Sequence, residues 1–391
     1  MKFQDTGNYK EAFHIISLLE KIGEARIVGG AVRDMLFSIE PKDLDIATTL
    51  KPEDVIKICK EAEIKFIPTG INFGTITAVV DGKNFEITTL RKDEKCDGRH
   101  AQVSFTTKWE DDASRRDFTI NALYMDKHGN VYDYKGGIQD LDDKMIKFID
   151  NPNDRIHEDH LRILRYFRFI SYIGVHKIDS QSMESSIKYS YLLDKISGER
   201  IRAEILKTLS NPYAIEVISI MYKNNVLDSI LIPKNFENIQ LLNFSNDPII
   251  NLAYILFINK TKKEHILQIY ERWKFSNKEK DRLSFLLFHE YKNLYLIDEP
   301  ALKELTYEYG VERISDIIAF QSLVFNIEQK EALLDRVLSY EYPKFPISGF
   351  DLMDLGIHGK ELNILLKKAK HIWIDSDFKK CKEQLIKELF I

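Results

Sequence analysis

The chain of 391 residues is longer than one hydrophobic core usually grows, so two or more packed units are expected. Its 44% hydrophobic and 30% charged residues are typical of a globular protein, and its longest apolar run, IINLAYILFI at 249–258, is too short to span a bilayer. Three scattered cysteines argue against a disulfide framework or a structural zinc site. The N-terminus does not resemble a signal peptide, so we expect a cytoplasmic protein.

Charge is distributed unevenly along the chain, whose formal net charge is -5. Residues 1–150 hold 22 of the 56 basic and 27 of the 61 acidic residues, which leaves 34 of each sign for the rest. Since neither part is basic overall, a site for nucleic acid would have to be a local patch of Lys and Arg.

Short β-type runs alternate with helical segments in the first 150 residues, which indicates a small mixed sheet with helices. The expected elements, in chain order, are the strand ARIVGG (25–30), the helix AVRDMLF (31–37), the strand DLDIAT (43–48), the helix KPEDVIKICKEA (51–62) and the strands FGTITAVV (73–80) and NFEITTLR (84–91), which DGK joins as a hairpin. The polar residues 91–114 are predicted to form a mobile loop or hairpin. A helix is predicted for RRDFTINALYM (115–125).

The character of the sequence changes after DNPND (150–154). Gly and Pro become sparse, and apolar residues recur with helical spacing in SGERIRAEILKTLSN (197–211) and KEHILQIYERWKF (263–275). The predicted fold class is therefore an α+β N-terminal head followed by an all-α second half.

Two aspartates are the first candidates for chemistry. KDLDIA places Asp43 and Asp45 two residues apart in an expected strand, hence on one face of it. Converging carboxylates repel one another unless a cation lies between them, and Mg²⁺ binds one or two carboxylates together with substrate phosphates. Many solvated strands end in such a pair, so the pair alone does not identify a metal site.

A candidate phosphate site precedes the aspartates. VGGAVRD puts Gly29 and Gly30 at a strand-to-helix turn, where backbone N–H groups and a helix N-terminus can hold phosphate, and Arg33 could add a charged donor. A turn needed only for chain reversal is the alternative. The run fits neither GxGxxG nor GxxxxGK[ST], so Rossmann and Walker sites are not supported.

Further candidates lie downstream of the aspartates. Glu86 could be a third carboxylate, or a solvated strand residue. In SRRDFTINAL, Arg116 could reach a phosphate and Asp117 a ribose hydroxyl, with Asn121 near them, although an exposed basic helix start is the alternative. The glycine turn DYKGGIQDL (133–141) is interpreted as structural.

The stretch EDHLRILRYFRF (158–169) carries arginines at every third position. Asp159 is followed by Arg162, Arg165 and Arg168 among apolar residues. The solvated face of an amphipathic helix and a nonspecific phosphate-binding helix are both consistent with this spacing. On an ideal helix, steps of three drift by about -60° each, so Asp159 and Arg162 are expected to be neighbours while Arg168 points elsewhere.

Taken together, these motifs resemble a known family. VGGAVRD, KDLDIA, RRDFTINAL, DYKGGIQDL and EDHLRILRYFRF, in this order and spacing, are similar to the bacterial CCA-adding tRNA nucleotidyltransferase and poly(A) polymerase family, class II of the DNA polymerase beta superfamily. The resemblance implies a catalytic head over 1–150, a helical neck that recognises the base over 151–210, and a helical body and tail that bind tRNA over 211–391.

The resemblance also implies roles for individual side chains. Asp43 and Asp45 would be catalytic ligands of Mg²⁺, with Glu86 as a possible third catalytic carboxylate. The residues that the resemblance implies to bind the nucleotide are Gly30, Arg33, Arg116, Asp159, Arg162, Arg165 and Arg168, with Asp159 and Arg162 reading the base. The local reading of the motifs adds Gly29, Asp117 and Asn121 as candidates. The polar stretch 91–108 corresponds to the flexible loop that the family needs to add A, so its presence argues against a CC-only activity.

Base chemistry explains how Asp159 and Arg162 would select C and A. Both bases present an amino donor beside a ring-nitrogen acceptor, which a carboxylate and a guanidinium satisfy. Uracil and guanine reverse this pattern, and each unsatisfied group in a desolvated site costs roughly 1–3 kcal/mol.

The implied function is template-independent addition of CCA to the 3′ end of tRNA from CTP and ATP, with release of pyrophosphate. The expected partners are tRNA and the two nucleotides, with no membrane and no protein partner implied. The alternatives are an A-adding tRNA nucleotidyltransferase or a poly(A) polymerase, and, from a different class, a non-catalytic RNA-binding module.

Overall fold

The computed structural model describes residues 9–96, 101–230, 245–289, 293–327 and 330–390. It divides into two compact units, Met1–Lys234 and Asn235–Ile391. Within the described ranges, no helix is both long enough and apolar enough to cross a membrane. The first unit contains a mixed sheet and the second is helical, which confirms the predicted fold class. The finer boundaries at residues 150 and 210 stay a prediction.

A seven-stranded sheet forms the centre of the first unit. Its strands, in spatial order, are β3 (Lys65–Gly70), β4 (Thr75–Val80), β5 (Lys83–Thr89), β2 (Ile46–Thr48), β1 (Ala25–Val28), β8 (Leu123–Met125) and β9 (Val131–Asp133). β2 and β5 are parallel and the other neighbours are antiparallel. The predicted hairpin is confirmed, since Val80 pairs with Lys83 across the turn.

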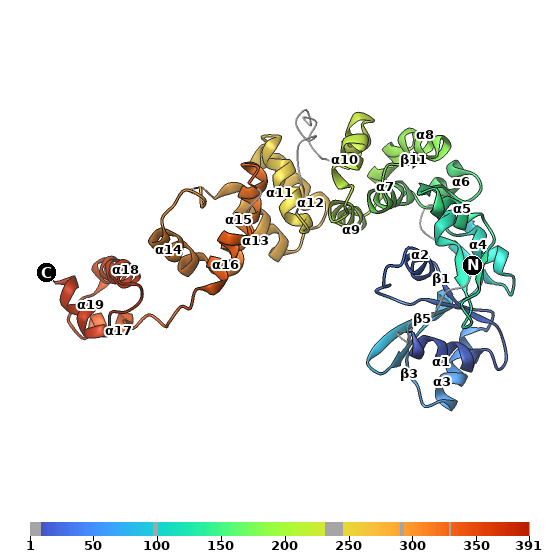
Figure 1. The fold of residues 1–391 in the computed structure, drawn as a ribbon, viewed down its shortest axis with the longest axis horizontal. Coiled ribbons are helices and arrows are strands. Elements are labelled where there is room, and N and C mark those ends of the chain that lie inside the picture. The colour runs from blue at the N-terminus through green and yellow to red at the C-terminus, as the bar shows by residue number, and fades with distance from the viewer. Residues whose placement is uncertain (1–8, 97–100, 231–244, 290–292, 328–329, 391) are drawn as a thin grey trace. The chain divides into compact units, whose positions relative to one another are not determined.

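Helices α1 (Lys10–Leu19) and α3 (Pro52–Glu61) pack against the sheet (Figure 1). The side chains of Ile76 and Ile87, opposite one another on β4 and β5, are fully buried. The helix predicted for residues 51–62 is present as α3, which begins at Pro52. Proline suits the first turn of a helix, because the N–H that it lacks would have no partner inside the helix.

The polar segment after β5 forms a hairpin of its own. β6 (Arg91–Cys96) pairs antiparallel with β7 (Ala101–Phe105), and residues 97–100 between them lie outside the described part of the chain. The hairpin, one of the two forms predicted for residues 91–114, is present at residues 91–105, whereas the end of that segment is helical. α4 (Trp109–Ser114) follows it directly.

The helix predicted for residues 115–125 is wrong. The segment contains only the short 3-10 helix η2 (Thr119–Asn121) and then enters β8, which pairs with β1 on one side and β9 on the other. The carboxylate of Asp117 accepts hydrogen bonds from the backbone N–H of Phe118 (2.9 Å) and from Asn121 Nδ2 (3.1 Å). Such local bonds compete with a helix, and the strand pairing outweighs helical propensity.

The glycine turn predicted to be structural precedes α5 (Gly137–Asp142). Gly136 has a positive φ of 76°, and a Cβ on Gly137 would lie only 2.2 Å from the Thr119 carbonyl oxygen. The turn therefore requires glycine at both positions, one for its backbone conformation and one for its close approach to η2.

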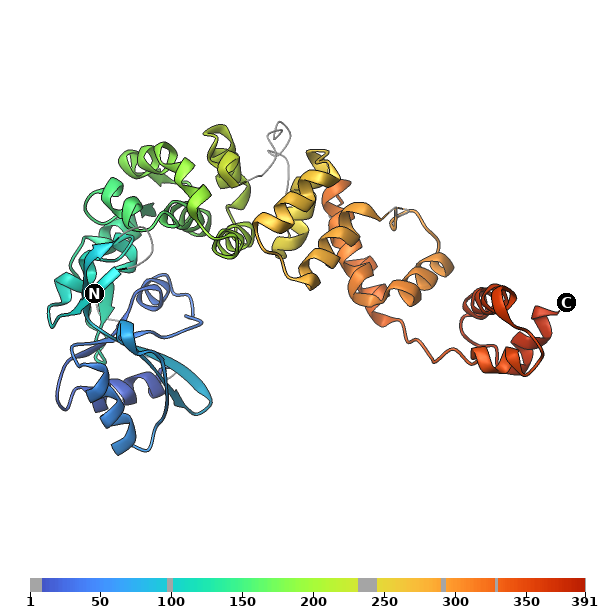
Figure 2. The ribbon, with the colours of Figure 1, turned by 180° about the vertical axis from the view of Figure 1, so that it is seen from behind.

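A group of helices completes the first unit (Figure 2). These elements are α6 (Pro152–Glu158), α7 (Arg162–Ile173), α8 (Ser180–Lys188), η3 (Ser190–Lys195), α9 (Gly198–Leu209), α10 (Ala214–Lys223) and η4 (Val226–Ile230), with a small parallel pair of strands, β10 (Met145–Ile146) and β11 (Lys177–Ile178). α7 packs against both α9 and α10.

The expectation that Asp159 and Arg162 lie on one helix is wrong. α6 ends at Glu158, Asp159 is extended (φ -151°, ψ 107°), and α7 begins only at Arg162. Asp159 Oδ1 accepts a hydrogen bond from Leu161 N (3.1 Å), which gives one of the backbone donors ahead of α7 a partner. The arginines of EDHLRILRYFRF therefore belong to α7, whereas its aspartate belongs to the link before it.

The second unit is built entirely from helices in its described ranges. They are α11 (Pro248–Ile258), α12 (Lys263–Arg272), α13 (Asn277–Phe288), α14 (Glu299–Tyr309), α15 (Val311–Val324), α16 (Glu331–Ser339), α17 (Gly349–Met353), α18 (Gly359–Asp375) and α19 (Lys382–Leu389). One apolar cluster joins residues of α14, α15 and α16, and a separate one joins α17, α18 and α19. Both ion pairs of Arg282, with Asp247 and Asp316, tie α13 to its neighbours.

Candidate active site

A cavity of about 670 Å³ in the first unit brings most of the predicted site residues together. Ten of the predicted residues line it: Gly29, Gly30, Arg33, Asp43, Asp45, Arg116, Asp117, Asn121, Arg165 and Arg168. Three predicted residues, Glu86, Asp159 and Arg162, are not among its lining residues. Residues 207–211, at the end of α9, contribute three further polar side chains that sequence reasoning missed.

The paired glycines connect β1 to α2 (Gly30–Leu36). Gly29 has a positive φ of 74°, which favours glycine, and its N–H is hydrogen-bonded to the Leu123 carbonyl oxygen (2.9 Å). A Cβ on Gly29 would lie in van der Waals contact with Arg116 Nη1, at 3.4 Å, so the backbone conformation is what favours glycine here. Gly29, Gly30 and Arg116 all line the cavity, so the turn brings its backbone close to that guanidinium.

Asp43 and Asp45 lie immediately before β2, and Glu86 lies on the adjacent strand β5. Ile46 pairs with Ile87, so Asp45 and Glu86 sit at neighbouring positions of two parallel strands. The surrounding protein, which desolvates the carboxyl group, raises the pKa of Asp45 to about 6; Glu86 and Asp43 add to this effect, and Arg116 opposes it. Negative charge therefore exceeds its local compensation here.

A cation would relieve this excess, and the donor set suits a hard one. Carboxylate oxygens are the ligands that divalent cations such as Mg²⁺ prefer. Within the described residues, no group of three or more His, Cys, Asp and Glu side chains is arranged to hold a metal ion. A metal bound by Asp43 and Asp45 would therefore need further oxygen ligands, which substrate phosphates supply.

Arg33 is held in place by two neighbours. Its Nε and Nη2 both donate to Asp34 Oδ1, at 2.9 and 2.7 Å, and its Nη1 donates to Asn121 Oδ1 at 2.8 Å. Tyr172, on α7, donates to the same Asp34 oxygen at 3.2 Å. The Arg33 side chain is only 9% exposed, so its direction is fixed by these bonds.

Asn121 links Arg33, through Asp117, to α7 by hydrogen bonds. Its Nδ2 donates to Asp117 Oδ1, and Arg165 Nε donates to the other oxygen of Asp117 at 2.7 Å. Burial alone would raise the pKa of Asp117, but Arg165 and the hydrogen bond from Asn121 lower it to about 2. A continuous chain of hydrogen bonds thus links Arg33 on α2 to Arg165 on α7.

The Arg116 side chain is also held in place by a carboxylate. Its Nε and Nη2 donate to Asp112 Oδ2 (3.1 and 2.9 Å), and Tyr124 donates to the same oxygen at 2.8 Å. Although burial of Asp112 opposes ionisation, Arg116 and Arg115 lower its pKa well below the usual range. Sequence reasoning missed Asp112, and the signal was its spacing of four residues from Arg116.

Arg168 pairs with a carboxylate from another helix. Its Nε lies 3.1 Å from Oε2 of Glu204 on α9, and this contact is an ion pair without a well-directed hydrogen bond. Burial, the largest influence, lowers the pKa of Arg168 despite this partner. Glu204 could not have been found from spacing, because 36 residues separate it from Arg168.

Asp159 and Arg162 have partners outside the cavity. Arg200 Nη2 donates to Asp159 Oδ2 at 2.7 Å, and Arg162 Nη1 donates to Glu158 Oε2 at 2.6 Å. Arg162 Nη2 donates to the Arg115 carbonyl oxygen at 2.9 Å. The structure therefore does not bring these two side chains to the residues around Asp43 and Asp45, and their role in reading the base stays a prediction.

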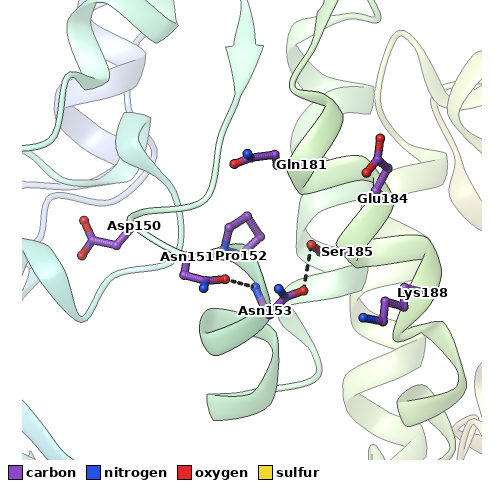
Figure 3. Close-up of a pocket in the computed structure, with 8 residues that line it drawn as sticks. All are labelled: Asp150, Asn151, Pro152, Asn153, Gln181, Glu184, Ser185 and Lys188. Atoms are coloured by element: carbon purple, nitrogen blue, oxygen red, sulfur yellow. Dashed lines mark hydrogen bonds between the residues drawn. The ribbon is translucent and has the colours of Figure 1, made fainter.

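A second cavity, of about 530 Å³, lies between the start of α6 and α8 (Figure 3). It is lined by Asp150, Asn151, Pro152, Asn153, Gln181, Glu184, Ser185 and Lys188. Asn151 Oδ1 accepts a hydrogen bond from Asn153 N, and Ser185 Oγ donates to Asn153 Oδ1, as Figure 3 shows. These contacts cap α6 and join it to α8, and no predicted site residue takes part.

Comparison with known proteins identifies the family. Residues 25–147 match the Poly A polymerase head domain, and residues 177–236 match a model described as "Probable RNA and SrmB- binding site of polymerase A". The chain is 35% identical to CCA tRNA nucleotidyltransferase 1, mitochondrial, from Mus musculus, over 93% of this chain and 86% of the relative. The chain belongs to the CCA tRNA nucleotidyltransferase family.

Other members of the CCA tRNA nucleotidyltransferase family resemble the chain along its whole length. The CCA-adding enzyme of Anoxybacillus flavithermus is 30% identical over 94% of this chain and 90% of the relative. The crystal structure of Bacillus stearothermophilus CCA-adding enzyme in complex with CTP has a TM-score of 0.82 at 25% identity and covers 98% of this chain and 96% of that one. Nucleotidyltransferases of this family use a divalent metal, which agrees with the carboxylate pair in the cavity.

Replacing Asp117 by asparagine tests the buried link to Arg165. A pKa lowered to about 2 corresponds to about 2 kcal/mol of stability at neutral pH, so the free energy of unfolding of Asp117→Asn should be lower by about this amount. The difference should be constant above pH 4 and shrink as the pH falls toward 2, because the unfolded wild-type carboxylate takes up a proton in this range while the folded one is still ionised.

Urea unfolding at pH 7, 5 and 3 measures this difference. The exposed Asp81, in the turn between β4 and β5, provides the control Asp81→Asn, which should unfold like the wild type. A gap between Asp117→Asn and the wild type that is as large at pH 3 as at pH 7 contradicts the ionic origin of the stabilisation.

Proposed function

We propose that the chain adds CCA to the 3′ end of tRNA, using CTP and ATP and releasing pyrophosphate. The observation that carries this proposal is the identity of 35% over 93% of the chain with a CCA tRNA nucleotidyltransferase. The cavity supports it, because the pair Asp43 and Asp45 and four arginines line one volume there. Carboxylates for a metal and guanidinium groups for phosphates are the parts that nucleotidyl transfer requires.

Asp43 and Asp45 are proposed as the ligands of Mg²⁺. The raised pKa of Asp45 supports this assignment, since a cation would offset the repulsion from Asp43 and Glu86. Glu86 is the candidate third carboxylate: it acts on Asp45 electrostatically although it does not line the cavity. When bound, the metal would hold the triphosphate and stabilise charge that develops on the reacting phosphate.

The arginines are proposed to bind the triphosphate. Gly29 and Gly30 line the cavity close to the guanidinium groups of Arg116 and Arg33. Arg165 and Arg168 would reach the phosphates from α7, because they are successive turns of one helix and both line the cavity.

Asp117 and Asn121 are proposed to act by positioning. Both carboxylate oxygens of Asp117 already accept hydrogen bonds, one from Asn121 and one from Arg165. Asn121 in turn holds Arg33. Contact of Asp117 with a ribose hydroxyl stays a prediction.

In the reaction, the 3′-hydroxyl of tRNA would attack the α-phosphate in line with the departing pyrophosphate. The residues of the cavity contribute fixed charge: Arg33 and Arg116 are already oriented by Asn121 and Asp112, so little reorganisation accompanies the transfer. A preorganised set of donors stabilises the transition state more than flexible donors would, because its ordering is complete before the reaction.

Selection of the base is proposed for Asp159 and Arg162. To pair with C or A, Asp159 would exchange its hydrogen bond from Arg200, and Arg162 its bond to Glu158, for bonds to the base. Arg162 has five N–H donors, so it can keep its bond to the Arg115 carbonyl oxygen while it turns one amino group to a ring nitrogen.

The remaining parts are proposed to hold tRNA. Residues 1–150 would form the catalytic head, 151–210 the neck that recognises the base, and 211–391 the body and tail that bind tRNA through shape and backbone contacts. Because residues 151–391 carry no net charge, binding should depend on local basic side chains and weaken with salt. A cytoplasmic location, expected from the sequence, stays a prediction.

The proposed function is tested with tRNA that lacks its three terminal nucleotides. Supplied with CTP alone, the protein should add two C, and with CTP and ATP it should complete CCA and stop. Failure to add C, with addition of A only to tRNA that already ends in CC, indicates an A-adding enzyme. Long A tracts on unrelated RNA indicate a poly(A) polymerase, and binding without incorporation indicates an RNA-binding module.

Replacing either Asp43 or Asp45 by alanine should abolish addition. Loss of a metal ligand removes several kcal/mol of transition-state stabilisation, which corresponds to a rate lower by about a thousandfold. Single-turnover addition of C to tRNA measures the rate, while circular dichroism and tRNA binding check the fold. Glu86→Gln tests separately whether the third carboxylate is needed for the reaction. Wild-type turnover in Asp43→Ala or Asp45→Ala would contradict this metal site.

Replacing Asp159 by alanine should weaken base selection. The variant should use CTP and ATP less well and should discriminate less against UTP, by roughly 10- to 100-fold, because the repulsion between the carboxylate and a uracil carbonyl oxygen is gone. The ratio of kcat/KM for CTP and UTP measures this change. Rejection of UTP as strong as in the wild type would show that Asp159 does not read the base.

A further inference from the structure

Every arginine that lines the cavity carries a carboxylate partner. The four pairs are Arg33 with Asp34 (2.7 Å), Arg116 with Asp112 (2.9 Å), Arg165 with Asp117 (2.5 Å) and Arg168 with Glu204 (3.1 Å). Each carboxylate is largely buried, with a side chain at most 19% exposed. The field of each arginine is therefore partly cancelled at the distance of a ligand.

A nucleoside triphosphate carries several negative charges, and the proposed metal is itself largely balanced by Asp43 and Asp45. Positive charge beyond these four pairs would therefore favour binding. Two lysines also line it, Lys42 and Lys207. Lys42 lies in the chain between Glu40 and Asp43, which also line the cavity and offset its charge. Lys207 forms no ion pair with any residue that the structure describes, because Glu204, one turn before it on α9, is paired with Arg168 instead.

Lys207 lies toward the end of the cavity that is opposite the predicted base-reading residue. Along α7 the predicted base-reading residue Arg162 comes first, and Arg165 and Arg168 follow at one turn each. Glu204, which holds Arg168, lies one turn before Lys207 on α9, and residues three apart on a helix have Cβ atoms about 5–6 Å apart. Lys207 is thus beside the arginine farthest from the base-reading end.

We infer that Lys207 binds the terminal phosphates of the incoming CTP or ATP and the pyrophosphate that leaves. This inference rests on the proposed function, since it assigns one further residue to the same cavity. The side chain is exposed and ends in a compact ammonium group with three donors, which suits phosphate oxygens whose positions change as pyrophosphate departs. Arginines held by buried carboxylates cannot follow such a movement, whereas a lysine on a four-carbon stem can.

Steady-state kinetics of Lys207→Ala tests this inference. The KM values for CTP and for ATP should rise by the same factor, about tenfold, and inhibition by inorganic pyrophosphate should weaken to a similar extent. Inhibition by CMP, which lacks the terminal phosphates, should not change, and neither should the KM for tRNA or the preference for CTP over UTP. Lys207→Arg should keep most of the wild-type affinity, because it restores the charge.

Lys223→Ala is the matched control. Lys223 is likewise an exposed lysine in the last turn of a helix of the first unit, α10, and it lines neither cavity. The Lys223→Ala variant should leave the KM values and the inhibition by pyrophosphate unchanged.

Two outcomes would overturn the inference while wild-type CCA addition stands. Unchanged KM values for both nucleotides and unchanged inhibition by pyrophosphate would remove Lys207 from the phosphate site. A rise in the KM for tRNA alone would show that this lysine contacts the RNA. Absence of CCA addition by the wild type would instead refute the proposed function itself, so the two failures are distinguishable.

Discussion

The buried chain of bonds from Arg33 through Asn121 and Asp117 to Arg165 is the constraint on which the cavity depends. It joins α2, which follows the glycine turn, to α7, which carries the arginines of the helical part. The strand β8 comes directly after Asn121, so the same short segment fixes both the sheet and the arginines. A buried polar network of this kind stabilises the fold only when each of its polar groups has a hydrogen-bond partner. Both polar atoms of the Asn121 amide and both carboxylate oxygens of Asp117 have one.

The cavity combines two electrostatic regimes. Around Asp43 and Asp45, burial raises the pKa of Asp45, and the negative charges of Glu86 and Asp43 add to this effect. Around the arginines, each positive charge is matched by a buried carboxylate, and the pKa of Asp117 falls. The first regime favours a cation, whereas the second orients guanidinium groups before any ligand arrives. Nucleotidyl transfer uses both, since it needs a metal beside the reacting phosphate and rigid donors around the others.

Much of the fold and of the candidate site could be predicted from the sequence. The glycine turn, the aspartate pair and the hairpin after β4 follow from local chemistry, and ten of the predicted residues line one cavity. The strand at Leu123–Met125 was not predicted, because its pairing with β1 joins it to residues far away in the chain. The break at Asp159 was missed because the apolar spacing of the helix continues through it, while a single side-chain bond to Leu161 ends that regularity.

The carboxylates behind the arginines explain what a substitution in this cavity can report. If Arg168 is replaced by alanine, Glu204 is left as a buried charge without its partner, which typically costs 3–5 kcal/mol. A scan of single arginines would therefore mix loss of stability with loss of nucleotide binding. Joint neutral replacement of an arginine and its carboxylate would separate the two, and the binding energy of each guanidinium group becomes measurable only in such paired variants.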